Sequence, residues 1–217
     1  MDDLTYRRLP AYANSDLTEL LCLKTGRSLQ KADPKTLQFG TIFHQLVLEP
    51  EKPVDWSGIH VKEQYALIQM QESFLKWIDP FWHSLHDREV IITETDVATK
   101  LPIKGRIDAV HKISGRIIDV KTTSCRDAQS FYNTFVEYGY DRQAAFYLDL
   151  HGISIANFLF IGIQKIKPFG LFMIDMGVSV ERRLMLEEGR RKNVRLLQQA
   201  LRESQNPMGW RPSSWSR

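Results

Sequence analysis

The order of the expected secondary-structure elements predicts an α/β fold, in which helices cover both faces of a mixed sheet. Three consecutive segments, 89–97, 102–112 and 116–122, are rich in β-branched and apolar residues and are separated by short turns, as antiparallel strands are. A mostly helical segment over 127–150 follows, and the apolar segment 153–165 then supplies a further strand. The predicted core is therefore a helix, three antiparallel strands, a second helix and a fourth strand, with extra helices around it.

The segments before the strands carry the sequence signals of helices. A short helix is predicted over 15–25, where an acidic pair has the spacing of a capping box. A second helix is predicted over 36–49, because its apolar residues form one stripe and Pro50 ends it. A third helical segment covers 62–87, and we expect a break in it at Asp79-Pro80.

The segments after the strands extend the core. The helical segment 127–150 is expected to be interrupted near Gly139. Beyond the strand at 153–165, a turn signal precedes a short strand at 171–176. A long amphipathic helix is predicted over 179–203, which lies outside the core.

Composition limits the class of protein. The chain has 217 residues, of which 43% are hydrophobic and 25% charged, so we expect a single domain over 1–204. Residues 205–217 are rich in Pro, Ser and Trp and are predicted to form a flexible tail. No apolar run approaches the roughly 18 residues of a membrane span, and two cysteines make no disulfide framework. We therefore expect a cytoplasmic protein without a membrane partner, and its net charge of +3 permits binding to nucleic acid.

The hairpin over 102–123 carries the strongest functional signal. If Ser114 and Gly115 form its turn, Asp108 lies opposite Lys121. Residues two apart on a strand share a face, so Asp108, Asp119 and Lys121 gather on one face of the hairpin. Two carboxylates and an ammonium in one place are typical of a site that holds a divalent cation and a phosphate. The alternative is a solvated strand face, on which charges also alternate.

Four further residues have side chains suited to such a site. His44 lies beside the apolar stripe of its helix, and Glu94 lies on the strand before the hairpin. Gln143 and Tyr147 are four residues apart on a predicted helix, so they share a face. Their amide and hydroxyl groups are suited to hydrogen bonds with phosphate or sugar oxygens. Each residue alone also fits an ordinary half-exposed position.

Together these residues resemble the PD-(D/E)XK nuclease superfamily, and within it the RecE-like (exodeoxyribonuclease VIII-like) exonucleases. The resemblance covers residues 13–176, and its motifs are a helix-borne His, an Asp, D-x-K and Q-x-x-x-Y, in that order. The segments that carry it are GTIFHQLVLEPE (40–51), TETDVATKLPIKGRIDAV (93–110), IIDVKTT (117–123) and YGYDRQAAFYLD (138–149), with a weaker match at ANSDLTELL (13–21). Ile107 stands where the superfamily name has Pro, a position that varies widely.

The resemblance implies a role for each matching residue. Asp108 and Asp119 would ligate Mg²⁺, for which Mn²⁺ would substitute, and Lys121 would orient or activate the attacking water. The other implied roles are a position at or near the metal for His44, ligands from the Val120 carbonyl and Glu94, and DNA contacts from Arg106, Thr122, Arg142, Gln143 and Tyr147.

The implied function is Mg²⁺-dependent hydrolysis of one strand of DNA from a duplex end. The expected polarity is 5′ to 3′, which leaves a 3′ single-stranded tail for a single-strand annealing protein of a phage or prophage. The resemblance also implies a ring of three or four subunits and a bacterial or phage-encoded origin. Two alternatives stay open: an endonuclease of the same superfamily in restriction or repair, and an inactive DNA-binding module. Intact Asp108, Asp119 and Lys121 argue against an inactive module.

Overall fold

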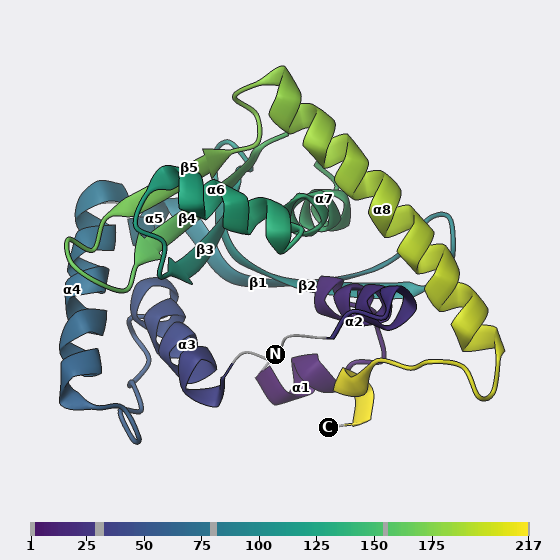
Figure 1. Cartoon of the computed structure of the whole chain (residues 1–217), viewed down its shortest axis with the longest axis horizontal. Coiled ribbons are helices and arrows are strands. Elements are labelled where there is room, and N and C mark those ends of the chain that lie inside the picture. The colour runs from purple at the N-terminus through teal and green to yellow at the C-terminus, as the bar shows by residue number, and fades with distance from the viewer. Residues whose placement is uncertain (1–2, 29–32, 79–81, 154–155, 217) are drawn as a thin grey trace.

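The computed structural model describes residues 3–28, 33–78, 82–153 and 156–216. Its centre is one five-stranded sheet (Figure 1). The strands are β1 (His86–Thr95), β2 (Pro102–His111), β3 (Ile117–Thr123), β4 (Phe158–Gln164) and β5 (Leu171–Asp175), and they are hydrogen-bonded in that order. β3 and β4 run parallel, whereas every other neighbouring pair is antiparallel.

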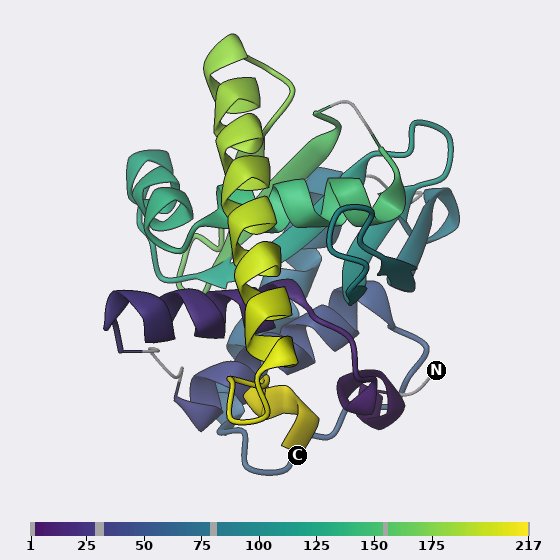
Figure 2. The ribbon, with the colours of Figure 1, turned by 90° about the vertical axis from the view of Figure 1, so that its right-hand side faces the viewer.

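Helices cover both faces of the sheet, which confirms the predicted α/β fold class. The larger helices are α2 (Asn14–Thr25), α3 (Pro34–Leu48), α4 (Val61–Ile78), α6 (Ala128–Glu137), α7 (Tyr140–His151) and α8 (Val180–Gln205). α3 and α4 pack on one face and α6 and α7 on the other, while α8 crosses α7 and contacts α2 (Figure 2). The short helices are α1 (Asp3–Arg8), α5 (Trp82–Leu85) and the 3₁₀ helix η1 (Ser213–Ser216).

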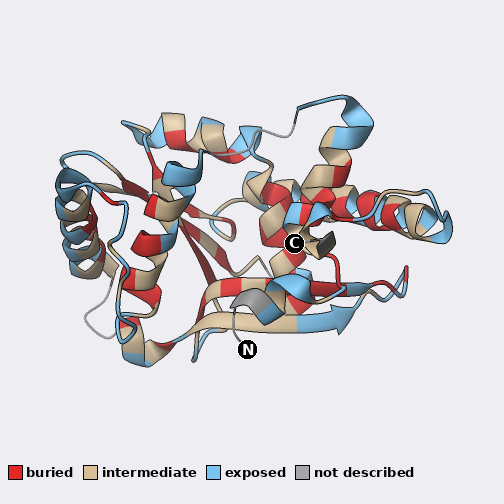
Figure 3. Ribbon diagram, turned by 90° about the horizontal axis from the view of Figure 1, so that it is seen from below, coloured by how far each residue is buried: buried red, intermediate tan, exposed pale blue. Residues whose placement is uncertain are grey.

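Strand β3 is buried on both faces, because its side chains alternate between two cores. Ile118 and Val120 join the core under α3 and α4. Ile117 joins the core under α6 and α7, so Asp119 and Lys121 point toward that side as well. The helices turn their buried residues toward the sheet and their exposed residues outward (Figure 3).

The pairing within the second hairpin differs by two residues from the prediction. The structure pairs Ala109 with Ile118, a register that places Asp119 rather than Lys121 opposite Asp108. The turn is wider than Ser114-Gly115, because the His111 N–H donates to the carbonyl oxygen of Arg116. A slip of two residues keeps the face of each β3 side chain, so Asp119 and Lys121 still share one face, as predicted.

The segment before β1 also differs from the prediction. The predicted helical segment 62–87 is α4 up to Ile78 and α5 over Trp82–Leu85, as expected, but β1 begins already at His86, where its residues pair with the end of β2. Pairing with a neighbouring strand outweighs the local helical pattern there. The predicted break at Asp79-Pro80 lies outside the described residues, as do residues 154–155 of the predicted strand 153–165.

The segment predicted to be a flexible tail packs against the N-terminal helices. The Trp210 Nε1–H donates to Glu19 Oε1 at 3.0 Å, and the Trp215 ring lies 5.0 Å from the Tyr12 ring, centroid to centroid. Two tryptophans bury enough apolar surface to hold a short segment, which a composition rich in Pro and Ser does not reveal. Among the described helices, none combines the length and the apolar character that crossing a membrane requires.

Candidate active site

The site forms at the pair Glu89 of β1 and Asp108 of β2, where the alternation of side chains between the two faces of the sheet is interrupted. The two strands keep one register on both sides of this step, so Glu89 lies opposite Asp108. On one side of it Ala109 faces the α3–α4 core, whereas on the other side Ile107 faces the α6–α7 core. Glu89 has a backbone φ of 51°, in the left-handed region that non-glycine residues rarely adopt. Such strain in a strand marks a position that the surrounding structure holds for another purpose.

The Asp108 side chain takes the place of a strand hydrogen bond. β2 and β3 pair at Ala109–Ile118 and Val110–Ile117, and beyond these pairs the strands separate. There the Val120 N–H donates to Asp108 Oδ2 at 2.7 Å instead of to a carbonyl oxygen of β2. The Asp108 carboxylate is therefore fixed between the two strands.

His44 approaches the same point from α3. Its Nε2 lies 2.8 Å from the Val120 carbonyl oxygen, and because a carbonyl only accepts, Nε2 carries the proton. In the neutral ring Nδ1 is then the atom with the free lone pair, and it lies 3.7 Å from Asp108 Oδ1. His44 thus turns its metal-binding nitrogen toward the carboxylate.

Three residues form a group that could hold a metal ion. One ligand atom each from His44, Glu89 and Asp108 lies within 4.8 Å of the others. Burial raises the pKa of the Glu89 carboxyl to about 7, and the Arg106 guanidinium, 2.9 Å away, opposes this rise. A carboxylate buried beside a second carboxylate is stabilised by a cation. Two carboxylates, one imidazole and a nearby carbonyl oxygen fit Mg²⁺ or Mn²⁺.

The sequence prediction missed Glu89 and named Glu94 instead. Glu94 is exposed and lies five residues further along β1, a separation of about 16 Å in an extended strand. The structure therefore does not bring Glu94 to the group. Glu89 is identified only by the register of the first hairpin, which pairs it with Asp108.

Asp119 and Lys121 form an ion pair beside this group. Asp119 Oδ2 lies 2.7 Å from Lys121 Nζ, and Asp119 Oδ1 accepts a hydrogen bond of 2.7 Å from Gln143 Nε2. Burial raises the pKa of Asp119 and Lys121 lowers it, with a result of about 6. Burial disfavours the Lys121 ammonium, but the carboxylates of Asp119 and Asp108 raise its pKa above the ordinary value. The pair is therefore ionised at neutral pH.

Helix α7 supplies the face that covers this ion pair. Gln143 holds Asp119, and the Tyr140 ring lies 5.2 Å from Lys121 Nζ, a cation–π contact. Tyr147 packs over Gly105 of β2, where an added Cβ would lie 3.2 Å from the Tyr147 ring. Burial and the Asp119 carboxylate raise the pKa of the Tyr147 hydroxyl, so it stays neutral and able to donate a hydrogen bond.

The three remaining predicted DNA contacts lie in different surroundings. Arg106 is paired with Glu89 at the metal group, and Thr122 lies on β3 beside Gly40 of α3. Arg142 is buried and points away from the group, toward α2 and α8. It donates to Thr18 Oγ1 at 2.6 Å and to Asn193 Oδ1 at 3.4 Å. Arg142 thus lies on the opposite side of α7 from Gln143, so the structure does not bring it to the metal group.

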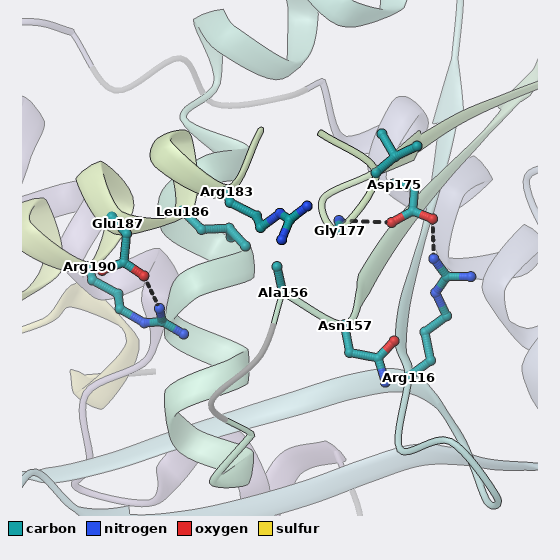
Figure 4. Close-up of a pocket in the computed structure, with 10 residues that line it drawn as sticks. Arg116, Ala156, Asn157, Asp175, Gly177, Arg183, Leu186, Glu187 and Arg190 are labelled. Carbon is teal, nitrogen blue, oxygen red and sulfur yellow. Dashed lines mark hydrogen bonds and ion pairs between the residues drawn. The ribbon is translucent and has the colours of Figure 1, made fainter. Parts of the chain in front are cut away.

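A separate cavity of about 630 Å³ lies at the other end of β3, between α8 and the ends of β4 and β5 (Figure 4). Two of its three arginines are neutralised by neighbours: Arg116 pairs with Asp175, and Arg190 with Glu187. None of the metal group lines this cavity. The residues that could bind a metal and a phosphate therefore lie together at the point where β2 and β3 part, and not at this cavity.

The comparisons with known proteins agree with this geometry. Residues 18–209 match a family described as a PDDEXK-like domain of unknown function (DUF3799). The chain belongs to this family. Asp108, Asp119 and Lys121 thus lie in a domain of the PD-(D/E)XK type, as the sequence predicts, and the family supports a nuclease.

Two solved structures are similar to the chain. One is a protein from Eubacterium rectale that is described provisionally as an exonuclease. It is 15% identical, with a TM-score of 0.58 over 90% of this chain and 83% of that one. The other, SSO0001, is 17% identical over 92% of this chain and 85% of its own, with a TM-score of 0.35. The first shares the fold, and the second is too dissimilar to support an argument. Among curated proteins there is no match.

Proposed function

We propose that the protein is a divalent-metal-dependent DNA nuclease of the RecE-like type. The observation that carries this proposal is the hydrogen bond from the Val120 N–H to Asp108, which places the metal group directly beside the Asp119–Lys121 pair. Carboxylates suited to a hard cation and an ammonium suited to an anionic substrate thus lie on neighbouring strands, with Glu89 on β1, Asp108 on β2 and Lys121 on β3.

The chain's own residues can divide the work of phosphodiester hydrolysis. His44, Glu89 and Asp108 would hold Mg²⁺ or Mn²⁺, and the Val120 carbonyl oxygen has a second lone pair for it. When bound, such an ion would polarise the phosphate and lower the pKa of a bound water. The Lys121 ammonium would stabilise negative charge on the attacking water and on the phosphate oxygens.

The neighbouring residues position this ammonium. Asp119 fixes Lys121 through their ion pair, and Gln143 fixes Asp119. Each Asp119 oxygen has one such partner and keeps a further lone pair, so this pairing is compatible with the direct ligand role that the sequence predicts for Asp119. The Tyr147 hydroxyl is available to a phosphate oxygen as a neutral donor.

We propose further that the enzyme acts from duplex ends with 5′ to 3′ polarity, and leaves a 3′ tail for an annealing protein. The motif order supports this proposal, and the provisional description of the protein from Eubacterium rectale agrees with it. A restriction or repair endonuclease is the competing enzyme of the same fold.

Digestion of DNA in the presence of Mg²⁺ tests the nuclease activity and distinguishes the exonuclease from the endonuclease. We expect linear duplex labelled at its 5′ end to release labelled nucleotides early, whereas label at the 3′ end is retained in long single strands. Closed circular plasmid should stay intact. Cutting of the circle would establish the endonuclease, and no digestion of either DNA with Mg²⁺ or Mn²⁺ would reject the nuclease.

A further inference from the structure

Two basic clusters that are distant in the sequence meet at one cavity. The cavity has a volume of about 800 Å³ and is lined by α2, by the junction of α6 and α7, and by α8. Arg27 lines it from the end of α2, and Lys192 and Arg195 line it from α8. Figure 2 shows how α8 crosses both α2 and α7, which brings these segments together.

The charges in this cavity are only partly neutralised. Lys192 Nζ lies 2.8 Å from Asp141 Oδ2, so these two side chains compensate each other. Arg27 and Arg195 are exposed, and within the described ranges neither side chain has a hydrogen bond or an ion pair. Arg142 adds a fixed positive charge at the base of the cavity, where Thr18 and Asn193 hold it. The cavity therefore favours an anion, despite Glu137 on its rim.

Aromatic rings connect this cavity to the candidate active site. Tyr138 lines the cavity with 52% of its surface exposed, and its ring lies 6.0 Å from that of Tyr140. The Tyr140 ring in turn lies 5.2 Å from Lys121 Nζ. A chain of two rings thus runs from the lysine of the ion pair to the basic cavity.

We propose that the cavity and the Tyr138 ring form a subsite for a single-stranded part of the DNA strand that is cleaved. Unpaired arginines beside an exposed aromatic ring are the combination that holds single strands, since the cations bind phosphates and a base stacks on the ring. We take this strand to be the one at the active site, because Tyr140 lies between the Tyr138 ring and Lys121. The inference rests on the proposed function, because it takes DNA as the substrate.

The test measures the affinity for fluorescent oligo-dT of about 12 nucleotides, within the range that one such groove binds. EDTA is present, so neither metal binding nor cleavage contributes. We expect Arg27→Glu/Arg195→Glu to raise the Kd, and to reduce the slope of log Kd against log salt by about 1.4, about 0.7 for each lost phosphate contact. Tyr138→Ala should raise the Kd about 5- to 160-fold and leave the slope unchanged.

The matched control is Lys62→Glu/Lys76→Glu, which makes the same change in net charge at exposed positions of α4, across the sheet from α7. It should leave the slope unchanged. An equal loss of affinity in the control would overturn the subsite, because net charge would then explain the effect. Arg27→Ala/Arg195→Ala repeats the measurement if the glutamate variant does not fold.

The outcomes separate the subsite from the nuclease itself. Wild-type protein that digests duplex DNA, together with an Arg27/Arg195 variant that keeps the wild-type Kd and slope, overturns the subsite alone. Wild-type protein that neither binds oligo-dT nor digests DNA overturns the proposed function and the subsite with it. Weaker oligo-dT binding by both cavity variants, but not by the control, establishes the subsite.

Discussion

The imidazole of His44 donates from Nε2 to the carbonyl oxygen of Val120 across 2.8 Å, which joins α3 to β3. This bond selects the tautomer of the ring and turns Nδ1 toward Asp108. The same Val120 accepts from His44 with its carbonyl and donates to Asp108 with its N–H. The backbone of Val120 therefore positions two side chains of the metal group, and a small shift of this backbone should displace both His44 and Asp108.

His44→Ala should weaken metal binding more than folding. It removes one ligand atom and the hydrogen bond that orients the ring, changes that typically cost 10- to 100-fold in metal affinity or activity. Titration of the initial rate of DNA digestion with Mg²⁺, and calorimetric titration with Mn²⁺, would measure this. His60→Ala, at an exposed histidine outside the group, is the control. An unchanged Mn²⁺ affinity for His44→Ala would remove His44 from the site.

Glu89→Gln should abolish most of the activity, whereas Glu94→Gln should be close to wild type. The first substitution removes a carboxylate from the metal group, and the second changes an exposed side chain of the same strand. Because both change one carboxylate of β1 to an amide, they form a matched pair. Rates of digestion at saturating Mg²⁺ would compare them, and a larger loss for Glu94→Gln would restore the ligand predicted from sequence.

This pair shows how far the sequence can predict the site. The alternation of charge along β3 identifies Asp119 and Lys121 whatever the pairing with β2, because residues two apart on one strand share a face. Glu89 depends on the register of a separate hairpin and on a local break in alternation, and no periodic pattern encodes these features. A helix pattern places Gln143 and Arg142 side by side in sequence, yet only packing against α2 and α8 shows that they point to opposite sides.

The fold is predicted well where local patterns and pairing agree. The strands of the hairpin and α8 have strong patterns, and the structure contains them close to their predicted limits. The start of β1 is wrong because pairing with β2 outweighs a helical pattern. The tail differs from its prediction because Trp210 and Trp215 pack on the body and Ser213 and Ser214 hydrogen-bond to Glu19 and Asp16, and composition does not encode such contacts between distant residues.

Lys121→Arg should preserve DNA binding and reduce turnover by orders of magnitude. The guanidinium is planar and larger than the ammonium, so it keeps the charge but does not fit between Asp119 and the Tyr140 ring in the same way. Binding of duplex DNA in Ca²⁺ and digestion in Mg²⁺ would separate the two effects. A wild-type rate for this variant would show that Lys121 acts only as a general phosphate clamp.

Stability without metal should fall as the pH rises from about 4.5 to 7. Burial raises the pKa of Glu89 to about 7 in the folded protein, so the unfolded chain loses this proton first. The stabilisation is complete below the unfolded pKa and is lost as the pH passes the folded pKa, an effect of the order of 1–3 kcal/mol. Thermal melting in EDTA would measure it.

Two comparisons assign this pH dependence to the metal group. Glu89→Gln should flatten the decrease, because the amide does not titrate, and what remains should come from groups such as Asp119, whose pKa burial also raises. Added Mg²⁺ should restore stability more strongly as the pH rises above about 7, where binding displaces fewer protons from Glu89. A decrease of the same size in Glu89→Gln would assign the effect to another group.

The protein should form a trimer or a tetramer in solution. Its net charge of +3 gives little sequence-independent attraction to DNA, so an exonuclease that does not leave its strand benefits from enclosing it. α8 is a source of contacts, since Leu184 and Val194 on it are exposed apolar residues. Light scattering at micromolar concentration should give three or four times the 25.2 kDa of the chain.

Leu184→Glu/Val194→Glu should then yield monomers and shorten each processive run, because charges at a subunit contact oppose association. Leu37→Glu/Val97→Glu makes the same change at exposed apolar positions outside α8 and should keep the assembly. Single-turnover digestion of long duplexes with a DNA trap would measure the run length. A monomeric wild-type protein that digests long duplexes without dissociating would rule out enclosure by subunits. The contacts that keep the enzyme on DNA would then have to come from a single chain, and the basic cavity beside Tyr138 would be the surface to test.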